Sequence, residues 1–138
     1  MLSLAICDID KFKRVNDTYG HAVGDRVIKA VAQTLRDHCA GNMVARIGGE
    51  EFVVIFPGLA PDAAAEILDV ARDMLGARQF KLRETDQPLG KVTFSAGVAH
   101  GRHPDGSSAL QRADALLYAA KNGGRDQVRW EAAQAQAA

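Results

Sequence analysis

The first hydrophobic segments of the chain predict a buried strand followed by an amphipathic helix. Leu2 to Cys7 form a short, largely apolar run that stops at Asp8 and Asp10, a pattern typical of a buried strand ending in carboxylates. Further along, apolar residues recur every fourth position, which predicts a helix from about Asp25 to His38. The residues on its predicted buried face are Val23, Val27, Val31 and Leu35.

Two more apolar runs predict a β-hairpin. Met43 to Ile47 and Phe52 to Phe56 flank the sequence Gly48-Gly49-Glu50-Glu51, and paired glycines suit a tight turn because they adopt positive φ at little cost. A second helix is predicted to begin at Pro61, since proline is well tolerated in the first turn. Its predicted buried face carries Ala64, Leu68, Ala71 and Leu75.

Two further strands are predicted in the second half of the chain. Gln79 to Glu84 and Lys91 to Ala99 have strand character and flank a polar turn at Asp86 to Gly90.

A capping box predicts the third helix. Ser108 and Gln111 have the required spacing, and Gly123-Gly124 supplies the end of the helix. Gln127 to Trp130 then predicts a short last strand, and the alanine- and glutamine-rich tail 131–138 is expected to be frayed. The predicted apolar face of the helix is Leu110, Ala113, Leu117 and Ala120.

The order of these elements predicts an α+β fold. The order β-α-β-β-α-β with extra C-terminal elements is that of the ferredoxin-like split βαβ, a central antiparallel sheet flanked by helices that we expect on one face. The 138 residues suit one domain, residues 1–130, and the 47% of hydrophobic residues suffices for a single core.

Composition excludes several classes of protein. Lysine plus arginine equals aspartate plus glutamate at 17 each, so the basic excess of a nucleic-acid-binding protein is missing. No apolar run is long enough for a membrane segment, and Leu2 to Ile6 is too short for a signal peptide. Cys7 and Cys39 fit no metal or disulfide framework and indicate a reducing compartment. We therefore expect a cytoplasmic protein.

Three carboxylates are candidates for a metal site. In a split βαβ we expect the first strand beside the first strand of the hairpin, so Asp8 and the pair Glu50-Glu51 can converge at one edge of the sheet. Clustered carboxylates suit Mg²⁺, and two such ions can activate a hydroxyl and stabilise a leaving oxygen. Spacing alone leaves open that these acids are ordinary solvated turn residues.

Several motifs together resemble the GGDEF family of diguanylate cyclase domains, in order and in spacing. The signature is Arg46-Ile47-Gly48-Gly49-Glu50-Glu51-Phe52, the Gly-Gly-Glu-Glu-Phe variant. The first-strand segment is Asp8-Ile9-Asp10-Lys11-Phe12-Lys13-Arg14-Val15-Asn16-Asp17, followed by Gly20-His21-Ala22-Val23-Gly24-Asp25. Ser95 to Ala99, Ala113 to Lys121 and Gly124-Arg125-Asp126 resemble the last strand, helix and turn of the family. The resemblance implies a fold similar to nucleotidyl cyclases and polymerase palm domains.

The resemblance implies a metal site and a base-recognition site. Asp8, the carbonyl of Ile9, Glu50 and Glu51 would hold two Mg²⁺ (or Mn²⁺) ions, and Glu50 would help to deprotonate the attacking ribose 3′-hydroxyl. Further residues implied to recognise guanine are Asn16 and Asp25, with His21 lining the site. Without the resemblance, Asp25 is equally a helix N-cap and Asn16 a turn residue.

Phosphate binding is implied for a second set of residues. The turn Lys11-Phe12-Lys13 would bind phosphate through backbone N–H groups and the Lys13 ammonium, together with Lys121 and Arg125. Gly48 and Gly49 would let the nucleotide approach the backbone. By itself, Lys121 is equally a solvated cation at a helix C-terminus. A P-loop is excluded because the chain has no Gly-x-x-x-x-Gly-Lys sequence.

The implied function is condensation of two GTP molecules into cyclic di-GMP across a homodimer. The chain starts at the first strand, without the segment that usually precedes it in the family, so we expect an upstream sensory or dimerising module in the parent protein. Cys39 to Asn42 replace the inhibitory Arg-x-x-Asp product site of many family members. The alternative is a degenerate domain that binds GTP or a protein partner. A third interpretation, an RNA-binding domain, lacks basic character and stacking aromatics.

Overall fold

A mixed sheet forms the centre of the molecule, and the strands of this sheet are β1 (Leu2–Ile9), β2 (Met43–Arg46), β3 (Glu51–Pro57), β6 (Phe94–His100) and β7 (Val128–Trp130). The computed structural model describes residues 1–132. Across the sheet the order is β2-β3-β1-β6-β7, and only the β6–β7 pair is parallel. The predicted α+β class and ferredoxin-like order are confirmed. The sheet is mixed rather than antiparallel because the added strand β7 runs parallel to β6.

The first strand pairs with the second strand of the hairpin, which corrects the predicted pairing. Asp8 on β1 lies opposite Glu51 on β3, whereas β2 forms the edge of the sheet. The helical crossover after β1 carries the chain past one strand position, and β3 then fills the gap beside β1. The convergence of carboxylates is retained because β3 begins where β1 ends.

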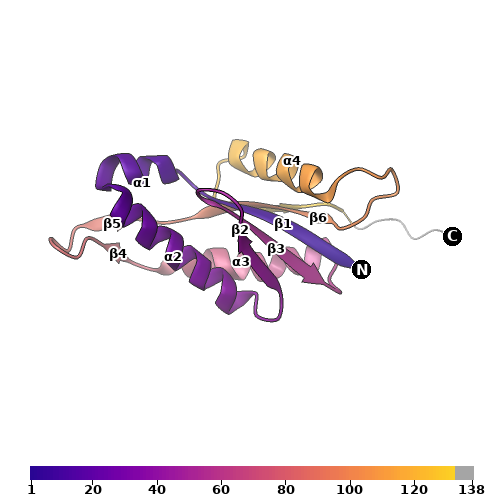
Figure 1. Ribbon diagram of the computed structural model, residues 1–138, viewed down its shortest axis with the longest axis horizontal. Coiled ribbons are helices and arrows are strands. Elements are labelled where there is room, and N and C mark those ends of the chain that lie inside the picture. Colours follow the sequence, from indigo (N-terminus) through magenta and orange to yellow (C-terminus); the bar gives the residue numbers. More distant parts are fainter. Residues whose placement is uncertain (133–138) are drawn as a thin grey trace.

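Helices cover both faces of the sheet, not one (Figure 1). The helices are α1 (Phe12–Tyr19), α2 (His21–His38), α3 (Pro61–Ala77) and α4 (Ala109–Asn122). The buried side chains of α2 and α3 pack with Ala5 and Cys7 on one face of the sheet, whereas those of α4 pack with Ile6 on the other face. Because side chains alternate along a strand and β1 is apolar throughout, both of its faces require cover.

The predicted helices are largely confirmed, and one helix was missed. All four apolar residues predicted on α3 are fully buried. Ser108 caps α4, and its Oγ accepts a hydrogen bond from the Gln111 backbone N–H at 3.4 Å. Leu110, however, is 48% exposed because it lies in the first turn, ahead of the buried part of α4. The short α1 was not predicted, because its polar residues obscure the apolar face formed by Phe12 and Val15.

The segment between α3 and β6 differs most from the prediction. It forms a separate two-stranded sheet of β4 (Phe80–Lys81) and β5 (Pro88–Gly90). The strand predicted over 79–84 is therefore shorter than expected, and β5 lies inside the predicted turn. The last predicted strand is confirmed as β7, and Glu131 beyond it pairs with Arg112 at 3.0 Å. The rest of the predicted tail, 133–138, lies outside the described residues.

Both cysteines are buried free thiols, as predicted. Burial raises the pKa of Cys39 to about 11 and raises the pKa of Cys7 further, with the charges of Cys39 and Asp8 adding to the effect. Neither thiol is therefore a reactive thiolate. None of the helices within residues 1–132 has the length and apolar character needed to cross a membrane.

Candidate active site

Three charged side chains from distant parts of the chain meet where β1 ends. Asp8 lies opposite Glu51 in the register of β1 and β3. Lys121, from the last turn of α4, donates to Asp8 Oδ2 at 2.9 Å. Asp8 is only 5% exposed, so its charge depends on these neighbours rather than on water.

The pKa of Glu51 is raised by burial and by the neighbouring carboxylate of Asp8. Burial raises the pKa of the Glu51 carboxyl, the negative charge of Asp8 and a hydrogen bond with Asp8 raise it further, and Lys121 lowers it. Two carboxylates that face each other disfavour simultaneous ionisation unless a cation compensates them. A second cation beside Lys121 would therefore reduce the repulsion between Asp8 and Glu51.

Glu50 is linked to the end of β1 through its backbone. Its backbone carbonyl accepts a hydrogen bond from the Ile9 N–H at 3.1 Å, which ties the signature turn to the end of β1. Glu50 precedes the first residue of β3 and lies in the bend of the signature turn, so it has no place in the register that sets Glu51 opposite Asp8. Within residues 1–132, no three His, Cys, Asp or Glu side chains gather closely enough to hold a metal ion by themselves.

The donors nevertheless fit a hard divalent cation. The carboxylates of Asp8 and Glu51 are the hard oxygen ligands that Mg²⁺ prefers, and Ile9, next to Asp8 on β1, adds a backbone carbonyl. Mg²⁺ ordinarily takes one or two carboxylates and keeps water or phosphate in its other positions. A group of three carboxylates is therefore not required.

Arg46 organises the signature turn, a role that sequence reasoning missed. Its Nε donates to the carbonyls of Gly48 and Gly49 at 3.0 and 3.1 Å, and the Ile47 N–H donates to the Glu51 carbonyl at 3.0 Å. Both glycines are exposed, and a Cβ on Gly49 would meet nothing within 4 Å. The space around the turn is thus open to a ligand. The arginine stood in the signature motif, but nothing in the sequence indicated its partners.

Asn16 carries an unpaired buried oxygen. It lies on α1 rather than in a turn, and its Oδ1 is buried without a hydrogen-bond partner among the described residues. A Cβ on Gly24 of α2 would lie 1.8 Å from this atom, so the glycine is required for the close packing of the two helices. An unsatisfied buried acceptor costs about 1–3 kcal/mol, which a donor from a ligand would recover.

The other residues predicted to recognise the base lie on α2. His21 begins the helix and Asp25 lies in its second turn, and both are exposed. Asp25 is therefore not an N-cap.

The predicted phosphate-binding turn is the beginning of α1. Lys11 is the N-cap residue in the left-handed region (φ 53), Phe12 is buried, and Lys13 is exposed. Backbone N–H groups at a helix N-terminus attract anions, so phosphate binding at this place stays a prediction. Arg125, in the turn after α4, is exposed, whereas Lys121 is paired with Asp8.

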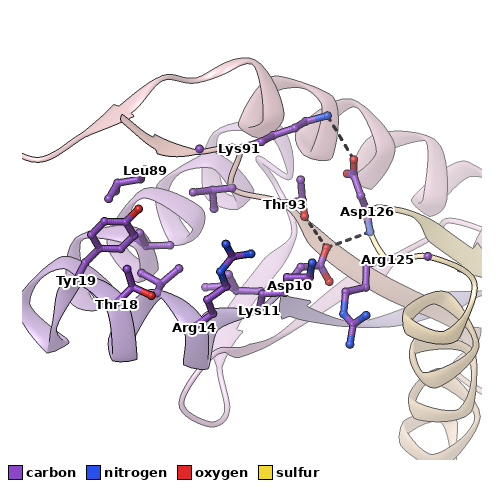
Figure 2. A pocket seen from close by; sticks show the side chains of 16 residues that line it. Asp10, Lys11, Arg14, Thr18, Tyr19, Leu89, Lys91, Thr93, Arg125 and Asp126 are labelled. Atoms are coloured by element: carbon purple, nitrogen blue, oxygen red, sulfur yellow. Dashed lines mark hydrogen bonds and ion pairs between the residues drawn. The ribbon is translucent and has the colours of Figure 1, made fainter. Parts of the chain in front are cut away.

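A pocket of about 410 Å³ lies beside this region, between α1, residues 89–93 and the turn 124–126 (Figure 2). Its lining includes Lys11 and Arg125 from the predicted site, together with Asp10 and Arg14, which the prediction did not include. Asp10 receives hydrogen bonds from Thr93, Ser95 and the backbone of Asp126. Sequence reasoning missed these contacts because the partners lie more than 80 residues away.

Comparison with known proteins identifies the family. The family model described as "Diguanylate cyclase, GGDEF domain" matches residues 1–127. The diguanylate cyclase DgcP of Pseudomonas aeruginosa is 41% identical over 92% of this chain, which covers 19% of that protein. The diguanylate cyclase VdcA of Vibrio cholerae is 40% identical over 92% of this chain and 38% of its own length. The chain therefore spans well under half of these curated relatives.

Solved structures agree with this family. The GGDEF domain of DgcB from Caulobacter crescentus, in complex with c-di-GMP, superimposes with a TM-score of 0.87 at 44% identity, over 94% of this chain and 77% of that one. The active GGEEF domain of a diguanylate cyclase from Vibrio cholerae has a TM-score of 0.80 at 28% identity, over 96% and 84%. With its signature turn beside paired carboxylates and a family match over nearly its whole length, this chain belongs to the GGDEF family of diguanylate cyclase domains.

Proposed function

We propose that this chain condenses two GTP molecules into cyclic di-GMP and two pyrophosphates. In each half-reaction the 3′-hydroxyl of one GTP attacks the α-phosphorus of the other, and pyrophosphate leaves. The observation that carries the proposal is the pair Asp8–Glu51, two facing carboxylates next to the turn of the signature hairpin in a GGDEF-family chain, with Lys121 bound to Asp8.

Asp8, Glu51 and the Ile9 carbonyl are the proposed ligands of two Mg²⁺ or Mn²⁺ ions. Bound there, such ions would stabilise the negative charge that develops on the attacking and leaving oxygens. Glu50 is proposed as a further ligand and as the group that accepts the proton of the 3′-hydroxyl. Its place in the turn before β3, outside the register that sets Glu51 opposite Asp8, supports a separate role.

Guanine recognition is proposed for Asn16 and Asp25, with His21 at the rim. The Oδ1 of Asn16 is an acceptor without a hydrogen-bond donor among the described residues, and guanine presents N–H donors on its Watson–Crick edge. The Asp25 carboxylate can accept from the ring N–H and the exocyclic amine. Adenine lacks this pair of adjacent donors, so the site favours GTP over ATP.

The phosphates are proposed to bind at the N-terminus of α1 and at the turn after α4. The backbone N–H groups from Lys11 to Lys13 and the Lys13 ammonium supply one side, while Arg125 and Lys121 supply the other. Lys121 is within reach of Asp8 in the free chain. A cation at Asp8 would release the Lys121 ammonium for phosphate.

Catalysis is proposed to require a homodimer, since one site holds only one of the two GTP molecules. A two-fold axis would present two sites to each other. Solved relatives include the coiled coil and GGDEF domain of DgcB and the diguanylate cyclase SiaD with its activator SiaC. By analogy, we propose a sensory or dimerising module upstream in the parent protein and activity in the cytoplasm.

The test is incubation of the purified chain with GTP and Mg²⁺ over a range of protein concentrations, followed by chromatography for cyclic di-GMP and pyrophosphate. Glu50→Gln and Glu51→Gln remove one charge each at the proposed site. Glu66→Gln removes the same charge from the exposed face of α3 and is the matched control. We expect product that rises more steeply than linearly with protein concentration, is lost in both site variants and persists in the control.

Product formation at a rate per chain independent of protein concentration would contradict the dimer. GTP binding without product, even after fusion of a dimerising helix before Met1, would instead identify a binding module. Full activity of both site variants would exclude the proposed carboxylates.

A further inference from the structure

Asp10 forms a hydrogen-bonded junction two residues after Asp8. Its carboxylate accepts from Thr93 Oγ1 at 2.6 Å, Ser95 Oγ at 2.7 Å and the Asp126 backbone N–H at 3.0 Å. Figure 2 shows two of these contacts, from Thr93 and from Asp126, converging on Asp10. One carboxylate thus joins β1, the segment that enters β6, and the turn that follows α4.

Asp126 extends this junction to α3. Its carboxylate pairs with Arg72 at 2.8 Å and with Lys91 at 3.4 Å. Arg72 is only 19% exposed and also binds Asp69 at 2.8 Å, so it holds Asp126 in a fixed place. The turn after α4 is therefore fixed from two sides, at its backbone by Asp10 and at its side chain by α3.

The backbone of this turn requires such support. Gly124, Arg125 and Asp126 have φ values of 111, 64 and 50, so two consecutive residues other than glycine adopt the left-handed conformation. Each such residue costs on the order of 1 kcal/mol and persists when its surroundings enforce it. The Arg125 N–H donates to the Ala120 carbonyl at 3.0 Å, the Arg125 carbonyl accepts from Gln127 Nε2 at 3.2 Å, and the Asp126 N–H donates to Asp10.

The geometry sets the direction of Arg125. Its guanidinium makes no hydrogen bond or ion pair with any residue in 1–132, so the side chain does not position itself. Arg125 shares its pocket with Asp10 and Lys11, which follow β1. We propose that Asp10 is a positioning residue that locks the turn 124–126 and thereby holds Arg125 where it binds the terminal phosphates of the nucleotide. This inference rests on the proposed function, in which Arg125 binds phosphate.

The test compares nucleotides with and without the terminal phosphates, and it needs no catalysis. Affinities for GTP and GMP are measured calorimetrically for the full chain, for Asp10→Asn, Arg125→Ala and the double variant. Asp17→Asn, on the exposed face of α1, is the matched control. We expect Asp10→Asn to weaken GTP by about tenfold, the value of one charge-assisted hydrogen bond, and to leave GMP affinity unchanged. In the Arg125→Ala background the same change should have no further effect.

A second measurement follows the turn without any nucleotide. Hydrogen exchange of the Asp126 amide should become faster in Asp10→Asn, while the amides of the sheet centre keep their protection. If Asp10→Asn does not fold, Thr93→Val and Ser95→Ala are used in its place, because each removes one hydrogen-bond donor to Asp10. Equal loss of GTP and GMP affinity, additive losses in the double variant, or unchanged Asp126 exchange would overturn the proposal. If the wild-type chain binds neither nucleotide, the proposed function and the role of Arg125 are contradicted. Faster Asp126 exchange in Asp10→Asn would then still support the locked turn.

Discussion

Lys121 Nζ lies 2.9 Å from Asp8 Oδ2, which joins the last turn of α4 to the end of β1. The Asp8 side chain is 6% exposed and also faces Glu51. Lys121 pairs with Asp8, and the cluster of Asp8, Glu51 and Lys121 keeps a net negative charge when both carboxylates are ionised. Lys121 thus partly compensates the negative charge at the site that is proposed to bind a divalent cation.

Removal of the Lys121 ammonium should destabilise the chain and make it more responsive to magnesium. Lys121→Ala leaves Asp8 buried without a counter-charge, so we expect the free energy of unfolding to fall by about 1–2 kcal/mol. Added Mg²⁺ should raise the melting temperature of this variant more than that of the wild type. Lys121→Arg keeps the charge and serves as control. An equal magnesium effect on all three proteins would argue against a cation at Asp8.

Glu51→Gln should stabilise the chain at neutral pH while abolishing activity. The pKa of Glu51 is raised in the folded chain, so the folded state binds this proton more tightly than the unfolded state. The wild type therefore loses stability as the pH rises through that raised pKa. We expect the variant to be more stable by up to about 1 kcal/mol at neutral pH, because it removes a partly desolvated charge that faces Asp8 and is screened by solvent.

The same advantage should disappear below the ordinary glutamate pKa of 4.5, where Glu51 is protonated in both states. Urea unfolding of wild type, Glu51→Gln and the control Glu66→Gln at several pH values measures this difference. A constant difference at every pH would show that ionisation of Glu51 is not its cause.

Gly24→Ala should damage the Asn16 site, whereas Gly76→Ala should not. The new Cβ at position 24 would lie 1.8 Å from Asn16 Oδ1 and 3.2 Å from Phe12 Cζ, so α1 must move. We expect weaker GTP binding and a stability loss of about 1–3 kcal/mol.

At position 76 the closest atom is Cε of the flexible Lys91, at 2.6 Å. There, better helix propensity should add up to about 1 kcal/mol. Calorimetry and thermal melting check both variants, and unchanged GTP affinity in Gly24→Ala would remove Asn16 from the proposed site.

Leu68 and Leu110 should differ sharply although both were predicted to be buried. Leu68 is fully buried, so Leu68→Ala should cost about 2–5 kcal/mol. Leu110 is 48% exposed, and Leu110→Ala should change stability by less than about 0.5 kcal/mol. Urea denaturation measures both, and similar losses would place the first turn of α4 against the core.

Cyclic di-GMP should not inhibit the chain through the segment 39–42. Cys39, at the position of the family's inhibitory arginine, is 1% exposed and ends α2 with its thiol in the core. Neither Cys39 nor Asn42 supplies the charge that would bind the phosphates of the product. Initial rates measured with added micromolar product should stay unchanged. Inhibition that Asn42→Ala relieves would contradict this prediction.

The sequence by itself determined the elements whose residues repeat locally. The four-residue spacing of Val23, Val27, Val31 and Leu35 specifies α2, and Pro61 and Ser108 mark the starts of two further helices. The signature and its companion motifs also indicated the family. These features depend on residues that are close together along the chain, through backbone geometry, capping and side-chain periodicity. They can therefore be predicted without knowledge of the fold.

Tertiary structure decided which of these residues meet. Alternation along β1 places α4 opposite α2 and α3, and the pairing of β1 with β3 sets Glu51, rather than Glu50, beside Asp8. The Asp10 junction and the Lys121–Asp8 pair join residues 83 to 116 positions apart. Such contacts depend on strand order and on which elements pack together, and a local pattern shows which face an element buries but not its partner.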